Sequence, residues 1–123
     1  MNGLLAVMAG GALGAGGRYG VGALLSAWTS TAFPWATLAV NLSGGLAMGL
    51  LAGMFARGGD SEAIRLFFGV GVLGGFTTFS AFSLDVVALI ERGQALPAFG
   101  YVAASVIGSV ALTMVGLHLV RAS

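Results

Sequence analysis

Hydroxyl side chains recur at four-residue spacing in the C-terminal part of the chain: Tyr101, Ser105, Ser109 and Thr113. Because an α-helix completes a turn every 3.6 residues, this spacing places the hydroxyls along one helix face. Each hydroxyl can donate a hydrogen bond, so the face could line a pathway for a small ion. Hydroxyls in membrane helices also bond to neighbouring helices or to their own backbone, and the spacing leaves both interpretations open.

An amide and two aromatic rings could join those hydroxyls in binding an anion. Asn41 lies inside an apolar segment, and Phe79 and Phe82 are three residues apart and share a helix face. The edge of an aromatic ring carries partial positive charge, so rings, amide and hydroxyls could hold a small, hard anion without a full positive charge. The alternatives are helix association for Asn41 and ordinary packing for the phenylalanines.

Two charged residues, Arg18 and Asp85, lie late in otherwise apolar segments. These two segments are expected to run in the same direction, so the charges reach similar depth and could pair. Alternatively, Arg18 extends to the membrane interface and Asp85 ends its helix near water. In both interpretations the two charges support the structure or the mouth of a pore.

Glycine is concentrated just before a run of Thr and Ser. Gly69, Gly71, Gly74 and Gly75 precede the sequence Phe-Thr-Thr-Phe-Ser at 76–80. Glycine destabilises a helix interior by about 1 kcal/mol, and hydroxyl side chains can satisfy the backbone groups that a break releases. We therefore predict a helix break near residues 74–78, where unwound carbonyls could coordinate a cation.

The elements that position these residues are predicted to be membrane helices. Hydrophobic residues make up 58% of the 123 residues, charged residues only 7%, and the mean hydropathy is +1.01, whereas soluble domains carry about 25% charged residues. A helix needs about 20 apolar residues to cross a bilayer. The expected fold is therefore all-α and integral to the membrane, a single domain with its third helix broken. Four transmembrane helices are predicted, at residues 3–26, 33–55, 64–90 and 96–120.

The joins between these stretches are short, so consecutive helices are expected to be antiparallel neighbours with both termini on one side. The arginines divide almost evenly between the two sides: Arg57, Arg65 and Arg121 on one, Arg92 and Arg18 toward the other. Orientation in the membrane follows the Lys/Arg count. The near balance therefore predicts insertion in both orientations, which favours an antiparallel dimer.

The composition excludes several function classes. The formal net charge is only +1, so no basic patch for nucleic acid is expected. Cysteine is absent, which excludes a disulfide framework and a thiolate metal site. His118 has no nearby acidic partner in the sequence, and no His/Asp/Glu or Ser/His cluster falls on one helix face. We therefore do not expect an enzyme.

Three segments together resemble the CrcB/Fluc family of fluoride channels. They are Gly-Gly-Ala-Leu-Gly-Ala-Gly-Gly-Arg-Tyr at 10–19, Thr-Leu-Ala-Val-Asn-Leu-Ser-Gly at 37–44 and Gly-Val-Leu-Gly-Gly-Phe-Thr-Thr-Phe-Ser-Ala-Phe-Ser at 71–83. The resemblance implies an antiparallel, dual-topology homodimer with two pores, multi-pass in the cell (inner) membrane. Fluoride would pass down its gradient through these pores, which relieves fluoride toxicity in the cytoplasm.

The resemblance also implies roles for individual residues. Asn41 matches the family's pore asparagine, and Phe79 and Phe82 match its anion-lining rings. A structural sodium ion at the dimer interface would be held by the backbone carbonyls of Gly74 and Thr77. The family's polar track falls on hydroxyl side chains of the third and fourth helices: Ser105 and Ser109, with Tyr101 nearby and Thr78 and Ser80 contributing.

The sequence departs from the family pattern at Asp85, where many members have glutamate. The shorter side chain would reach less far toward Arg18. The core motifs show no loss that would argue against transport.

Two other functions compete with a channel. A small multidrug-type exporter, which couples efflux to protons, needs a carboxylate embedded in the membrane. The first apolar segment has none, and Asp85 lies close to a helix end. A non-transporting assembly subunit would need only small residues at helix interfaces, such as Gly45, Gly49 and Gly53. It would leave the Gly-Gly-Phe-Thr-Thr-Phe-Ser segment unexplained.

Overall fold

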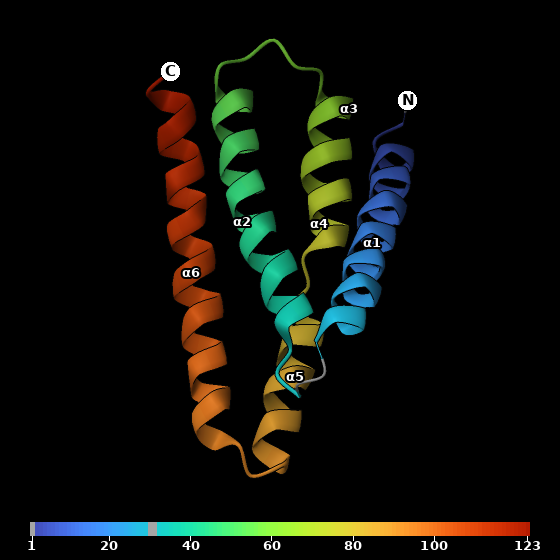
Figure 1. Ribbon diagram of the computed structural model, residues 1–123. Helices are drawn as coiled ribbons and strands as arrows, with labels where there is room; N and C mark the ends of the chain where they lie inside the picture. Colours follow the sequence, from blue (N-terminus) through green and yellow to red (C-terminus); the bar gives the residue numbers. More distant parts are fainter. Residues whose placement is uncertain (1, 30–31) are drawn as a thin grey trace.

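The computed structural model describes residues 2–29 and 32–123, and every regular element in this part of the chain is helical (Figure 1). The long elements are α1 (Gly3–Trp28), α2 (Trp35–Ala56) and α6 (Ala95–Arg121). Between α2 and α6 the chain forms four shorter elements in succession: α3 (Glu62–Arg65), the π-helix η1 (Leu66–Leu73), α4 (Gly74–Phe76) and α5 (Ser80–Glu91). The observed boundaries differ from the predicted ones by at most two residues.

Three stretches are long and apolar enough to cross a membrane by length and composition: Trp35–Ala56, Glu62–Glu91 and Ala95–Arg121. The 26 residues of α1 give it sufficient length, but glycines and Arg18 lower its hydropathy. The chain is therefore a multi-pass membrane protein. In Figure 1, α1 begins and α6 ends at the same end of the bundle.

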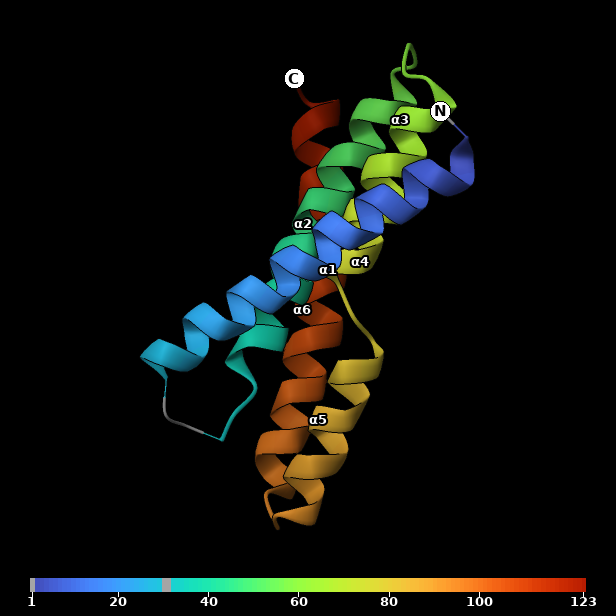
Figure 2. The ribbon, with the colours of Figure 1, turned by 90° about the vertical axis from the view of Figure 1, so that its right-hand side faces the viewer.

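The predicted break in the third helical stretch is confirmed at Thr77–Phe79, between α4 and α5. Figure 2 shows α5 as a separate rod below α4 and beside the lower half of α6. The reason for the break differs from the expected one, because Gly74 has helical dihedrals, φ −63° and ψ −38°. The chain leaves the helix at Thr77, whose ψ is 154°. The preceding π-helix was not predicted from the sequence.

Several glycines are contact points between helix backbones. A Cβ atom on Gly14 of α1 would lie 2.0 Å from the carbonyl oxygen of Val72 in η1. A Cβ atom on Gly49 of α2 would lie 2.1 Å from the carbonyl oxygen of Thr113 in α6. Such distances are too short for any side chain, so glycine is required where α1 packs on η1 and where α2 packs on α6.

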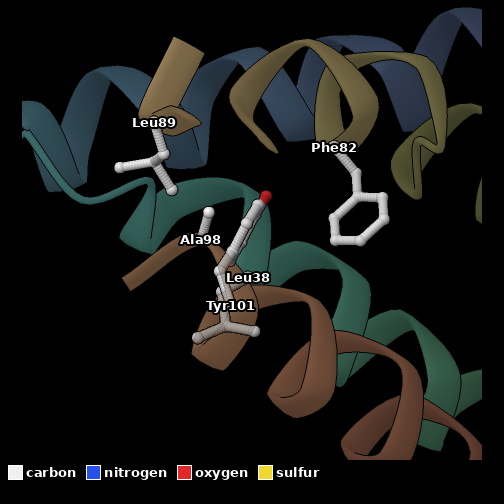
Figure 3. Close-up of a cluster of buried hydrophobic side chains, with 5 residues drawn as sticks. All are labelled: Leu38, Phe82, Leu89, Ala98 and Tyr101. Atoms are coloured by element: carbon white, nitrogen blue, oxygen red, sulfur yellow. The ribbon is translucent and has the colours of Figure 1, made fainter. Parts of the chain in front are cut away.

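A small hydrophobic core lies where α2, α5 and α6 meet. Figure 3 shows its five buried side chains: Leu38, Phe82, Leu89, Ala98 and Tyr101. Most other large apolar side chains are exposed on the outside of the bundle. This distribution suits a protein whose outer surface contacts lipid instead of water.

Candidate functional site

A groove of about 380 Å³ lies beside the helix break, between α2, α5 and α6. Its polar lining comes from the amide of Asn41 and from hydroxyls of Thr77 and Thr78 at the break and of Ser105, Ser109 and Thr113 on α6. Of the eight residues predicted to line a pore, the groove brings together six: Asn41, Thr78, Phe79, Phe82, Ser105 and Ser109. Ser80 and Tyr101 do not line it.

The side chain of Asn41 is bonded to the peptide backbone at the break. Asn41 Nδ2 donates to the carbonyl oxygen of Thr78 at 3.0 Å, and the backbone N–H of Thr78 donates to Asn41 Oδ1 at 2.9 Å. The Asn41 carboxamide thus bonds both backbone polar groups of Thr78, its N–H and its carbonyl oxygen. A carboxamide has two N–H groups, so one remains for another acceptor.

The hydroxyl of Thr78 caps the N-terminus of α5. Thr78 Oγ1 accepts a hydrogen bond from the backbone N–H of Ala81 at 3.1 Å, as the side chain of a helix N-cap does. The same oxygen lies 3.3 Å from Ser80 Oγ, so these two predicted hydroxyls contact each other at the rim of the break.

The hydroxyls of α6 divide between the two roles that the sequence left open. Thr113 Oγ1 lies 2.9 Å from the carbonyl of Gly45 in α2, and Ser109 Oγ makes a longer contact of 3.4 Å to the carbonyl of Asn41. Thr113 therefore joins α6 to α2, whereas Ser109 makes only a weak contact to α2 and also lines the groove. Ser105 is only 6% exposed, and its hydroxyl has no partner within the described residues. Ser105 thus retains a free donor inside the groove.

Tyr101 lies one turn away from the groove, fully buried in the core. Its ring packs edge-on against Phe33, with centroids 5.5 Å apart, and its hydroxyl donates to Asp85 Oδ2 at 3.0 Å. The four-residue spacing correctly placed Tyr101 on the same helix face. The spacing could not reveal that this end of the face is covered by α5.

Arg18 and Asp85 do not pair in the described structure. The interpretation in which the two charges form an ion pair is therefore excluded. Arg18 Nε donates to the carbonyl oxygen of Gly75 at 3.1 Å, whereas Asp85 accepts from Tyr101. Arg18 also lines a second cavity, of about 400 Å³, together with Tyr19 and Thr37. Both charges thus have polar partners inside the bundle.

A metal site made of side chains is absent from the described residues, which contain no cluster of three or more His, Cys, Asp or Glu. Backbone oxygens at the break are available instead. Nothing in the described structure donates a hydrogen bond to the carbonyls of Gly74, Phe76 and Thr77. Unpaired carbonyls at a broken membrane helix suit a hard cation such as sodium.

The groove is also lined by residues that carry no functional signal in the sequence: Gly44, Met48, Val106 and Val110. Apolar side chains in a membrane helix carry no signal that separates a groove from a lipid-facing surface. Gly44 has a steric role, since a Cβ atom there would lie 2.2 Å from Thr77 Cγ2. A larger residue would therefore force the side chain of Thr77 to move.

Comparison with known proteins adds independent information. The family model described as "CrcB-like protein, Camphor Resistance (CrcB)" matches residues 5–117. A relative from Sphingopyxis alaskensis is 53% identical over 122 residues, which cover 98% of this chain and 97% of the relative. A relative from Rhodospirillum centenum is 54% identical over 119 residues, which cover 96% of this chain and 94% of the relative. Both relatives are named "Fluoride-specific ion channel FluC".

Proposed function

We propose that this chain, which belongs to the CrcB-like protein family, is a fluoride-selective ion channel of the cell (inner) membrane. Fluoride would leave the cell passively, which lowers its cytoplasmic concentration and its toxicity. The name of the relatives supports this function, because they match nearly the whole chain at about half identity.

The observation that carries the proposal is the donor set of the groove. Ser105 offers an unpartnered hydroxyl, Asn41 retains one amide N–H, and Phe79 and Phe82 lie beside them. No carboxylate lines the groove. Fluoride is small and strongly hydrated, so a pore must offer close donors that replace water without holding the ion. Weak, sequential donors meet both requirements.

We assign the remaining hydroxyls to the same pathway at its two ends. Ser109 continues the α6 face beyond Ser105, and Thr78 and Ser80 lie at the rim of the break. Tyr101 and Asp85, bonded to each other, would support the wall of the pathway from behind.

The functional unit would be an antiparallel, dual-topology homodimer of four-helix subunits. Within one chain the groove and its polar groups open outward, and exposing an unsatisfied polar group to lipid costs several kcal/mol. A second copy would cover the groove and the exposed ring of Phe79. The balanced arginines support insertion in both orientations. A sodium ion at the interface would be held by the carbonyls of Gly74 and Thr77.

The two competing functions have less support. A proton-coupled multidrug exporter needs a carboxylate in its transport pathway, whereas Asp85 lies outside the groove and is bonded to Tyr101. A non-transporting assembly subunit gives no reason for the buried, unpartnered hydroxyl of Ser105.

Fluoride efflux from proteoliposomes, measured with a fluoride electrode, tests the proposal. We expect rapid release of fluoride but not of chloride, and loss of that release in Asn41→Asp, because a carboxylate would repel the anion. Absence of fluoride release from correctly inserted protein would favour the assembly subunit.

A further inference from the structure

The hydrogen bonding around the break departs from a helix in a specific way. In an uninterrupted α-helix, the N–H of each residue bonds to the carbonyl four residues earlier. The N–H of Thr78 would therefore bond to the carbonyl of Gly74, and the N–H of Ala81 would bond to the carbonyl of Thr77. Neither bond is present.

The N–H groups of Thr78 and Ala81 instead donate to side-chain oxygens. The N–H of Thr78 donates to Asn41 Oδ1 at 2.9 Å, and the N–H of Ala81 donates to Thr78 Oγ1 at 3.1 Å. Each bond to a side chain, made in place of the helical bond, leaves one backbone carbonyl without its usual N–H donor. The two released carbonyls are those of Gly74 and Thr77, the pair expected to hold sodium.

Two neighbouring carbonyls, in contrast, do accept hydrogen bonds. The carbonyl of Gly75 accepts from Arg18 Nε, and the carbonyl of Thr78 accepts from Asn41 Nδ2. Gly74 is exposed at the surface of the chain. The carbonyl of Phe76, the last residue of α4, likewise has no donor among the described residues.

We propose that Asn41 and Thr78 are positioning residues for the cation site, because their side-chain oxygens keep the carbonyls of Gly74 and Thr77 out of the helical bonding pattern. This inference rests on the proposed sodium site. It gives Asn41 a second role, separate from contact with the anion. It also explains why a threonine follows Thr77: the hydroxyl at position 78 replaces a backbone acceptor.

The test uses sodium binding to the purified full chain. Thr77 and Thr78 form the only Thr-Thr peptide in the sequence. Labelling threonine with ¹³C at the carbonyl and with ¹⁵N therefore gives one ¹³C–¹⁵N correlation, which reports the Thr77 carbonyl in proteoliposomes. The signal is followed as sodium replaces N-methyl-glucamine at constant ionic strength. The variants are Asn41→Leu, which removes the acceptor, and Ser83→Ala, a control whose hydroxyl bonds only to the Phe79 carbonyl.

We expect the wild-type and Ser83→Ala signals to shift with sodium at the same concentration. Loss of groups that orient metal ligands weakens metal affinity by about 10–100-fold, and we expect this range for Asn41→Leu. Thr78→Val provides a second variant, read by the sodium dependence of the thermal unfolding midpoint, if Asn41→Leu does not fold.

Unchanged sodium affinity in either folded variant would overturn the inference. A wild-type protein that shows no sodium response would overturn it together with the proposed sodium site. Fluoride conduction is measured separately and does not depend on this outcome, so the two failures are distinguishable.

Discussion

The rings of Phe79 and Phe82 lie 5.5 Å apart, centroid to centroid, yet Phe79 is 76% exposed and Phe82 only 7%. Phe79 belongs to the break and projects outward, whereas Phe82 lies in α5 and packs on Tyr101 (Figure 3). Two aromatic residues with the same sequence signal therefore have different structural roles.

The first prediction separates these two roles. Phe82→Ala removes a core side chain, so it should destabilise the folded chain by about 3–5 kcal/mol. Phe79→Ala should leave stability of the single chain nearly unchanged. Because an aromatic contact contributes about 0.5–1.5 kcal/mol, fluoride flux should fall by about two- to tenfold. Thermal unfolding in detergent and proteoliposome efflux measure the two effects. Unchanged flux in both variants would remove the rings from the pathway.

The second prediction concerns the hydroxyls of α6. Ser105→Ala removes a buried hydroxyl that has no partner, so it should leave stability unchanged or raise it, while fluoride flux decreases. Thr113→Val removes the contact to the Gly45 carbonyl and should destabilise the protein by about 0.5–1.5 kcal/mol. The same thermal and efflux assays apply. If Ser105→Ala were strongly destabilised with normal flux, Ser105 would be a structural residue.

The third prediction tests the contact between α1 and η1. Gly14→Ala should destabilise the protein by about 1–3 kcal/mol, because the added Cβ would overlap the Val72 carbonyl. Gly16→Ala is the matched control on the same helix, since a Cβ there meets no atom within 4 Å. The control should be neutral or more stable by up to about 1 kcal/mol. Equal unfolding midpoints for the two variants would contradict the observed packing.

The extent of the long helical stretches could be predicted from the sequence, because length and hydropathy are properties of residues that lie close together in the chain. The break was also predictable, since glycines followed by Thr and Ser weaken a helix locally. Its exact limits were not, because they involve a bond between segments far apart in the sequence, from the N–H of Thr78 to the side chain of Asn41 in α2. The π-helix likewise has no signal in residue types.

The candidate site could likewise be predicted only in part. Periodicity placed Tyr101, Ser105 and Ser109 on one helix face, as observed. It could not say which of them would be covered by α5, bonded to α2 or left free. That outcome depends on helix packing, which the close contacts at Gly49 and Thr113 determine. For the same reason the sequence left open whether Arg18 and Asp85 pair, since depth in the membrane does not fix lateral position; in the structure they have other partners.

Recording of single-channel current in planar bilayers tests the central claim most directly. With a tenfold fluoride gradient and symmetric chloride, passive fluoride conduction predicts a reversal potential about 59 mV from zero, at the equilibrium potential of fluoride. The current should persist without a proton gradient and decrease in Ser105→Ala. Reversal at zero would contradict selectivity for fluoride, and transport only with a proton gradient would favour a coupled exporter.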